Sequence, residues 1–307
     1  MPGRDEPPLL TGLSEVSAET GRYQPISTAV LCHLQAAMLL EARERGETDC
    51  VCSADLGVSK AVAALSSAGA TFPDGTGATW SALERIAADV KGCFEVCGNE
   101  IGRIQQMSGR SGRLASLYPT MGPPALLLSG TLMHRVRGID PAEDTRRKLA
   151  PLGRLEGARL LDAATGLGYT AIEAADRGAR VVTVEWDPAV DIIAGRNPWS
   201  AKLFDTAAIE RRSGDVGEEI AAFDDGAFDA VLHDPPVIEL AGDLYGGEFY
   251  RQLHRVLRRG GRLFHYIGNP DSPSGARALR GVRRRLGEVG FDDVRRQPEA
   301  FGVSARA

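Results

Sequence analysis

The feature that most constrains the fold is a regular alternation of strand-length apolar runs with helix-length amphipathic segments, which begins near Pro141 and continues to the C-terminus. This alternation predicts a parallel sheet with helices on both faces. The predicted strands are Arg159–Ala163, Arg180–Glu185, Ile209–Arg212, Phe228–His233, Arg262–Ile267 and Asp293–Arg296. The predicted helices are Tyr169–Asp176, Pro188–Ala194, Val216–Phe223, Gly247–Leu257 and Ser274–Val289. Right-handed crossovers give a doubly wound sheet whose ligand crevice lies at the carboxyl ends of the strands.

The first 140 residues lack this alternation. Their spacing predicts helices over Ser27–Arg45 and Trp80–Val90, and a hairpin turn at Gly98-Asn99. Strand-like runs lie at Cys50–Ala54, Ala61–Leu65, Phe94–Val96 and Ile101–Gln105. A Gly/Pro-rich stretch over Tyr118–Pro124 then interrupts the pattern. We therefore expect a smaller α+β domain over residues 1–140, which shapes a substrate pocket, and a second domain over residues 141–307.

The composition is that of an ordinary globular protein. The chain has 307 residues, of which 43% are hydrophobic and 25% are charged. Its apolar stretches fall far short of the roughly 20 residues of a membrane span, and its first residues do not have the layout of a signal peptide. The odd number of cysteines, all in the first third of the chain, argues against a disulfide framework. We expect a cytoplasmic protein with buried free thiols and no metal site.

The net charge of −5 is unevenly distributed. Residues 251–307 hold 13 arginines against 5 acidic residues, whereas residues 1–250 carry the acidic excess. A global bias toward nucleic acid is therefore absent. We expect five of these arginines to form the solvent-exposed face of one helix: Arg277, Arg280, Arg283, Arg284 and Arg285. The basic run Arg146-Arg147-Lys148 is expected to serve solubility.

The first predicted strand leads into a glycine turn that suits a ligand. The run Leu160–Thr170 has an aspartate at the strand tip, Asp162, followed by Gly166 and Gly168. Glycine lets a ligand approach the backbone closely because no Cβ is in the way. Ala171 stands where the dinucleotide fingerprint has its third glycine, and alanine is allowed there, so the turn alone does not distinguish between nucleotide ligands.

Acidic residues also follow the next two predicted strands. Glu185 lies 23 residues beyond Asp162, a spacing that suits hydrogen bonds to ribose hydroxyls. Trp186 comes directly after it and could stack on an adenine or simply pack. Asp215 follows the third strand, where its carboxylate could accept an adenine amine, cap the next helix, or do both.

The fourth predicted strand ends in a rigid acidic turn. Asp234 is followed by Pro235 and Pro236, which stop the strand and stiffen the backbone, so the carboxylate is held over the crevice. His233 and His265 lie at or near the ends of neighbouring strands. Both are candidates for moving a proton, and the alternative for each is a histidine packed inside the sheet.

These motifs together resemble a class I S-adenosylmethionine-dependent methyltransferase over about Asp144–Ala307. The runs His233–Pro236 and Gly261–Pro270 resemble more specifically an archaeal-type group of predicted methyltransferases that is distantly similar to polyamine synthases. The first domain is similar to that group at Leu117–Thr120 and Met133–Arg135. The resemblance implies an α/β fold with a Rossmann-like, doubly wound, seven-stranded and mostly parallel sheet, plus the smaller N-terminal α+β domain.

The resemblance also implies the cofactor S-adenosylmethionine, with S-adenosylhomocysteine as the product. Gly166 and Gly168 would line the methionine part, with Asp162 near its amino group. Glu185 would hold the ribose and Asp215 the adenine amine. The full set of implied cofactor-binding residues is Asp162, Ala164, Thr165, Gly166, Gly168, Tyr169, Thr170, Glu185, Trp186, Asp215 and Val216. The implied catalytic residues are Asp234, His233 and His265.

Asp234 would face both the methyl group and the acceptor. In amino-methylating relatives an aromatic residue follows the Asp-Pro-Pro run, whereas this chain has Val237, which weakens the case for a nucleic-acid acceptor. The main prediction is methyl transfer to a small molecule or another amine-bearing acceptor, with no membrane partner and with homodimer formation left open. The alternatives are aminopropyl transfer from decarboxylated S-adenosylmethionine, a nicotinamide-dependent oxidoreductase, and a non-catalytic nucleotide-binding module.

Overall fold

A computed structural model describes residues 28–236 and 242–307 of the chain. Its largest sheet has seven strands in the order β14-β13-β12-β15-β16-β18-β17. Their bounds are β12 Arg159–Asp162, β13 Arg180–Glu185, β14 Ile209–Ser213, β15 Phe228–His233, β16 Leu257–Tyr266, β17 Asp292–Gln297 and β18 Gly302–Arg306. The pairs on either side of β12 are parallel, and only β18 pairs antiparallel with its neighbours. The predicted fold class is confirmed.

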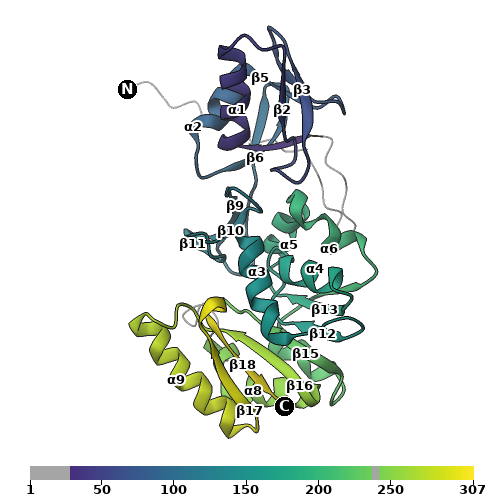
Figure 1. Cartoon of the computed structure of the whole chain (residues 1–307), viewed down its shortest axis with the longest axis vertical. Helices are drawn as coiled ribbons and strands as arrows, with labels where there is room; N and C mark the ends of the chain where they lie inside the picture. The colour runs from purple at the N-terminus through teal and green to yellow at the C-terminus, as the bar shows by residue number, and fades with distance from the viewer. Residues whose placement is uncertain (1–27, 237–241) are drawn as a thin grey trace.

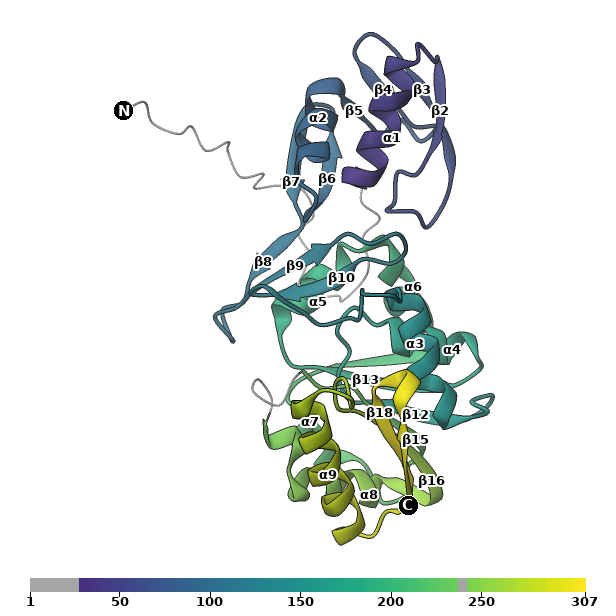
Figure 2. The same cartoon turned by 60° about the vertical axis from the view of Figure 1, so that its left-hand side comes forward.

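Helices cover both faces of this sheet (Figures 1 and 2). They are α3 Pro141–Leu149, α4 Tyr169–Asp176, α5 Pro188–Gly195, α6 Ala201–Asp205, α7 Val216–Glu219, α8 Gly247–Val256 and α9 Pro273–Glu288. Successive strand residues point to opposite faces, so Leu160 packs in one apolar core with α3 to α6, while Leu161 packs in a second core with α7 to α9. This two-sided burial explains why the central strands β12, β13 and β15 are mainly apolar.

The N-terminal part contains two small sheets beside two helices. Its elements are β1 Ala29–Cys32, α1 His33–Glu44, β2 Asp49–Cys52, β3 Ala61–Leu65, β4 Gly69–Thr71, β5 Gly77–Thr79, α2 Trp80–Ala88, β6 Cys93–Cys97 and β7 Glu100–Arg103. The strands are ordered β1-β6-β7 and β2-β3-β4-β5. The pairing of Cys97 with Glu100 confirms the hairpin turn at Gly98-Asn99.

The predicted helix over Ser27–Arg45 is wrong at its start. Ser27 lies outside the described residues, and Ala29–Cys32 form strand β1, which is fully buried and pairs antiparallel with β6. The helix α1 begins only at His33. A four-residue apolar run has no periodicity of its own, so a buried strand that leads into a helix reads like one longer helix.

A third small sheet was not predicted from the sequence. It consists of β8 Gln105–Met107, β9 Leu114–Tyr118, β10 Ala125–Leu128 and β11 Thr131–Leu132, in the order β11-β10-β9-β8. It lies between the N-terminal elements and the large sheet (Figure 2) and contacts α5 through β8 and β9. Arg196, which directly follows α5, donates to both oxygens of the buried Glu95 of β6, at 2.8 and 2.7 Å. This ion pair joins the N-terminal part to the part that contains the large sheet. The domain boundary at residue 140 stays a prediction.

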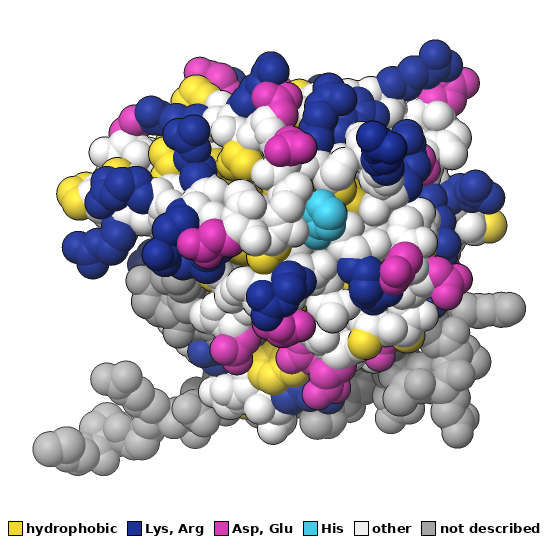
Figure 3. All heavy atoms as spheres, turned by 90° about the horizontal axis from the view of Figure 1, so that it is seen from below, with side chains coloured by type: hydrophobic (Ala, Val, Ile, Leu, Met, Phe, Trp, Pro, Cys, Tyr) yellow, Lys and Arg dark blue, Asp and Glu magenta, His cyan; other side chains and the backbone are white. Residues whose placement is uncertain are grey.

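The expected free thiols and the basic helix face are both present. The five cysteines are unpaired, and all but Cys97 are buried. Arg277, Arg280, Arg283 and Arg284 are exposed along α9, whereas Arg285 is partly buried. Figure 3 shows Lys and Arg side chains gathered on the face of the molecule at the α9 end. Within residues 28–236 and 242–307, no helix combines the length and the apolar character that crossing a membrane requires.

Candidate active site

A cavity of about 900 Å³ opens at the carboxyl ends of the strands of the large sheet. Its floor comes from the carboxyl ends of four strands and the residues that follow them, namely Ala163–Gly166, Val184–Asp187, Gly214–Glu218 and Asp234–Pro236. Its opposite wall comes from β10, β11 and the residues just after them, and includes Leu126, Leu128, Leu132, Met133 and His134. The small third sheet therefore forms one side of the site.

The two glycines of the first turn serve different purposes. Gly166 has φ +54°, and a Cβ built on it would meet nothing within 4 Å, so a ligand can approach the backbone there. Gly168 has φ +76°, and its Cβ would lie 2.6 Å from a methyl group of Leu203, so this glycine is required for packing. Gly168 does not line the cavity, although Ala164, Thr165, Tyr169 and Thr170 around it do.

Glu185 lies at the centre of the floor, where two backbone amides hold its carboxylate. Oε2 accepts from the amide of Gly166 at 2.9 Å, and Oε1 accepts from the amide of Asp187 at 2.9 Å. Burial raises the pKa of Glu185 to about 7, against the lowering effect of these two amides. Each oxygen keeps a lone pair that can accept from a hydroxyl of a bound ligand.

Asp162 lies behind the floor and does not itself line the cavity. Its side chain is fully buried, and Oδ2 accepts from the hydroxyls of Thr170 at 3.0 Å and Thr183 at 3.1 Å. Oδ1 is buried without a hydrogen-bond partner among the described residues. Burial raises the pKa of Asp162 to about 8. A cofactor contact of Asp162 stays a prediction, and the orphaned oxygen is the feature that favours it.

This pKa makes the stability of the free protein depend on pH in a defined direction. The folded pKa of Asp162 is about 8, whereas that of an unfolded aspartate is about 3.9, so between these values the native state holds a proton that the unfolded chain lacks. Relative to Asp162→Asn, which cannot titrate, wild type should lose about 1 kcal/mol of unfolding free energy per pH unit up to pH 8 and nothing above it. Urea unfolding of both proteins from pH 5 to 9 measures this. A constant difference contradicts the raised pKa.

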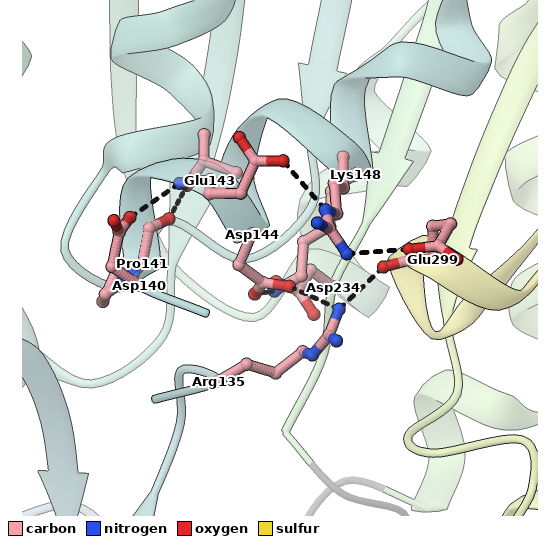
Figure 4. Close-up of polar contacts among 10 residues, drawn as sticks. Arg135, Asp140, Pro141, Glu143, Asp144, Lys148, Asp234 and Glu299 are labelled. Atoms are coloured by element: carbon pink, nitrogen blue, oxygen red, sulfur yellow. Dashed lines mark hydrogen bonds and ion pairs between the residues drawn. The ribbon is translucent and has the colours of Figure 1, made fainter. Parts of the chain in front are cut away.

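Asp234 follows β15 and lines the cavity, and a buried lysine holds it there (Figure 4). Lys148 of α3 donates to Oδ2 of Asp234 at 2.6 Å and pairs with Asp144 at 2.8 Å. Asp144 also accepts from Arg135 at 3.1 Å. Oδ1 of Asp234 has no hydrogen-bond partner within the described part of the chain. One oxygen of Asp234 is thus fixed, and the other is available to a ligand.

The expectation that Lys148 serves solubility is wrong. Its side chain is only 4% exposed and lies 4.6 Å from the ring centroid of Tyr266. Burial alone would lower the pKa of Lys148, but the charges of Asp234 and Asp144 outweigh it and the pKa is raised. The lysine therefore stays charged. Burial raises the pKa of Asp234, and Lys148 limits that increase.

The structure does not place His233 or His265 in the cavity, so we withdraw the prediction that they are catalytic. Both are fully buried, and neither lines the cavity. Their rings lie 4.4 Å apart beside Phe249. His233 Nε2 bonds to the carbonyl of Leu244 at 2.9 Å, and His265 Nε2 bonds to the hydroxyl of Tyr250 at 2.9 Å. Burial lowers the pKa of both imidazoles, to about 4 for His233, so they pack as neutral rings.

The remaining predicted cofactor residues line the cavity at its other end. Trp186 is 39% exposed, and the guanidinium of Arg110 lies 5.4 Å from its ring centroid. Asp215 caps α7 by accepting from the amide of Gly217 at 2.7 Å, so the capping alternative is confirmed. Asp215 and Val216 also line the cavity, and an adenine contact stays a prediction. Val237, which bears on the acceptor, lies outside the described residues.

Comparison with known proteins identifies the family of the chain. Residues 161–265 match a family model described as a methyltransferase domain. An uncharacterised protein of Methanocaldococcus jannaschii is 41% identical to the chain over 237 residues, which cover 77% of this chain and 80% of the archaeal protein. The chain belongs to the class I S-adenosylmethionine-dependent methyltransferase family. S-adenosylmethionine is the cofactor of this family.

The chain is also similar to a polyamine aminopropyltransferase and, in fold, to spermidine synthases. Polyamine aminopropyltransferase 2 of Streptomyces coelicolor is 31% identical over 192 residues, which cover 60% of this chain and about a third, 33%, of that protein. Two spermidine synthase structures, one with a transition-state analogue and one from Thermotoga maritima, superpose with TM-scores of 0.54 and 0.53. They are 19% and 18% identical, cover 66% of this chain, and extend over 73% and 70% of those chains. At this identity they show a shared fold.

The residues of the cavity fit the cofactor of the family. The open space at Gly166 admits a ligand close to the backbone. The carboxylate of Glu185 is fixed by two amides and can accept from two hydroxyls. The buried, partnerless Oδ1 of Asp162 leaves an acceptor for a cationic group behind the same turn. Ligand sites span roughly 300–1,000 Å³, so a cavity of about 900 Å³ lies at the large end of this range and has room for a cofactor.

Proposed function

We propose that this protein transfers the methyl group of S-adenosylmethionine to an amine nitrogen of a small, cationic acceptor. The observation that supports an amine is the charge of the cavity. Seven acidic residues line it against two basic ones. The acidic residues are Glu185, Asp187, Asp215, Glu218, Asp234, Asp243 and Glu248, and the basic residues are Arg113 and Lys148. Because Lys148 is already paired with two carboxylates, the excess attracts a cation.

The cofactor supplies an electrophilic methyl group on a sulfonium, so the main task of the protein is to align the acceptor with it. Glu185 holds the ribose, and the turn at Gly166 holds the methionine part. Asp234 receives the acceptor nitrogen on its free Oδ1, while Lys148 keeps Oδ2 in place. An ammonium cannot attack, so its proton must first leave. A carboxylate with a raised pKa takes this proton more readily than an ordinary one.

The proposal is tested by measuring first cofactor binding and then transfer of the methyl group. Calorimetry should show that the purified protein binds S-adenosylhomocysteine, and cofactor labelled in its methyl group should transfer the label to an amine from a set of diamines, polyamines and amino-acid amines. Absence of cofactor binding contradicts the proposal as a whole. Labelling of a carboxylate or hydroxyl acceptor, and of no amine, contradicts the acceptor class alone.

The second candidate function is aminopropyl transfer from decarboxylated S-adenosylmethionine. The similarity to an aminopropyltransferase and to spermidine synthases favours it, and acidic residues such as Asp243 and Glu248 at the cavity suit a polyamine acceptor as well. The two functions use different cofactors. Affinities measured side by side for the cofactor with and without its carboxylate separate them, and the methyltransferase proposal requires tighter binding of the carboxylated form.

Glu185→Gln should weaken binding of S-adenosylhomocysteine about 10- to 100-fold. Either orientation of the new amide turns an NH₂ group toward the amide of Gly166 or Asp187, and the charge that accepts from ribose is lost. Calorimetry measures the affinity. Glu156→Gln, at an exposed glutamate of the same chain, is the matched control and should bind like wild type. An unchanged affinity of the Glu185 variant removes the ribose assignment.

A further inference from the structure

His134 lines the cavity and has no part in the proposed mechanism. It follows β11, in the wall that faces the floor of the cavity. Its Nδ1 accepts a hydrogen bond from the backbone amide of Leu126 at 3.1 Å. An imidazole nitrogen that accepts carries no proton, so in the neutral ring the proton lies on Nε2. Nε2 has no hydrogen-bond partner among the described residues.

The ring stays neutral at physiological pH, which makes this tautomer a fixed donor. Burial, together with the nearby charge of Lys148, lowers the pKa of His134 to about 3. The groups that face His134 from neighbouring elements are Lys148 of α3 and Tyr169 of α4, and neither accepts a hydrogen bond from its Nε2–H group. His134 therefore offers one N–H group to whatever occupies this end of the cavity.

The position of the His134 ring indicates which part of a bound ligand its N–H group would contact. Its centroid lies 5.3 Å from the ring centroid of Tyr169, the first residue of α4, directly after the Gly166–Gly168 turn. On this side of the turn, the Nε2–H group of His134 is a donor, and the charge of Lys148 lies close enough to lower the pKa of the ring. Asp162 lies on the other side, behind Thr170, with an oxygen that lacks a partner. An amino-acid group, with its ammonium toward Asp162 and its carboxylate toward His134, matches this polarity.

We infer that His134 donates its Nε2–H to the carboxylate of the amino-acid tail of the cofactor. The inference deepens the proposed function and rests on it. It also provides a reason for the choice of reaction, because the decarboxylated cofactor of aminopropyl transfer has no group for this donor. His134 is thus a binding residue that favours the carboxylated cofactor and, with it, methyl transfer.

Two variants separate the two nitrogens of the ring. The carbonyl oxygen of asparagine lies near the place of Nδ1 and can keep the bond from Leu126, but nothing replaces Nε2–H. The amide nitrogen of glutamine lies near Nε2 and keeps the donor, but Leu126 loses its acceptor. His134→Asn should weaken S-adenosylhomocysteine binding about 10- to 100-fold, the range of a lost hydrogen bond to a charged group, while His134→Gln should stay within about threefold of wild type.

5′-Methylthioadenosine, which lacks the amino-acid tail, is the matched ligand and should bind equally well to wild type and both variants in calorimetry. His254→Ala, at a partly buried histidine that packs edge-on against Phe291, is the control protein. If glutamine weakens both ligands more than asparagine does, the role of His134 is structural and the inference is overturned. If wild type binds no S-adenosylhomocysteine, the proposed function itself fails. If wild type binds it and His134→Asn binds it equally well, only this inference fails.

Discussion

Asp234→Asn should reduce kcat for methyl transfer about 1,000-fold while leaving the affinity for S-adenosylhomocysteine within about threefold of wild type. Asparagine can still accept from Lys148 and so preserves the local geometry, but it cannot take a proton from an ammonium acceptor. Loss of a positioned base costs about 10² to 10⁴ in rate. Steady-state kinetics with labelled cofactor, together with calorimetry, measure both quantities on the same protein.

The pH profile gives this prediction a second readout. If Asp234 is the base, kcat/KM of wild type falls as pH decreases through the pKa of Asp234, which burial raises above the ordinary aspartate value. The residual activity of Asp234→Asn should lack this acidic limb. Asp205→Asn, at an exposed aspartate that ends α6, is the matched control and should behave like wild type. If the kcat/KM profile of Asp234→Asn keeps the full acidic limb, a group other than Asp234 takes the proton from the acceptor.

The strands that form the floor of the cavity and the helices that follow them were predictable because each carries its own local signal, whereas α3 was not predicted. The predicted bounds of β13, β15 and α4 agree with the structure at both ends. The central strands β12, β13 and β15 are mainly apolar. The helices α5 and α9 each begin with a capping residue followed by proline, Asp187-Pro188 and Ser272-Pro273. Local signals of this kind fix the carboxyl ends of the strands, and with them most of the floor of the site.

The opposite wall of the cavity was not predictable, because its strands lack such local signals. The strands β9 and β10 are short and separated by a Gly/Pro-rich stretch, and their place in the fold involves contacts with distant segments, such as that of β9 with α5. One such contact is the bond from the Tyr169 hydroxyl to the carbonyl of Pro124 at 2.8 Å. In the sequence, His134 lies in a stretch that resembles other proteins, and its neighbours along the chain indicate no chemical role, because that role depends on where the wall places the ring.

Lys148 shows a different limit of the sequence. The run Arg146-Arg147-Lys148 looks like a solvated charged face, and Arg146 and Arg147 do pair with Glu143 near the surface. The helical spacing of these residues is what indicates that Lys148 is buried. The buried stripe of α3 contains Asp144, Thr145, Lys148 and Leu149. A stripe with opposite charges four residues apart is read as a surface pair by default, and only the tertiary structure shows that it is covered.

Lys148→Met should therefore lower the free energy of unfolding by about 3–5 kcal/mol. Methionine fills a similar volume, but Asp144, which is 1% exposed, then keeps only Arg135 as an ion-pair partner among the described residues, and the carboxylate of Asp234 loses its cation. An uncompensated charge in the interior accounts for a loss of this size. Urea unfolding near neutral pH measures it. Lys202→Met, at a lysine that is 64% exposed and pairs with Asp176, should cost less than about 1 kcal/mol.

The double variant Lys148→Met/Asp144→Asn distinguishes lost charge balance from lost packing. If the cost of Lys148→Met comes from the buried carboxylate, removing that charge should restore part of the stability, and the coupling energy in the double-mutant cycle should exceed about 1 kcal/mol. The acidic limb of kcat/KM should also move to higher pH in Lys148→Met, because Lys148 limits the pKa increase of Asp234. Additive losses together with an unmoved limb would mean that Lys148 contributes only packing, and that the free oxygen of Asp234 is positioned by something else.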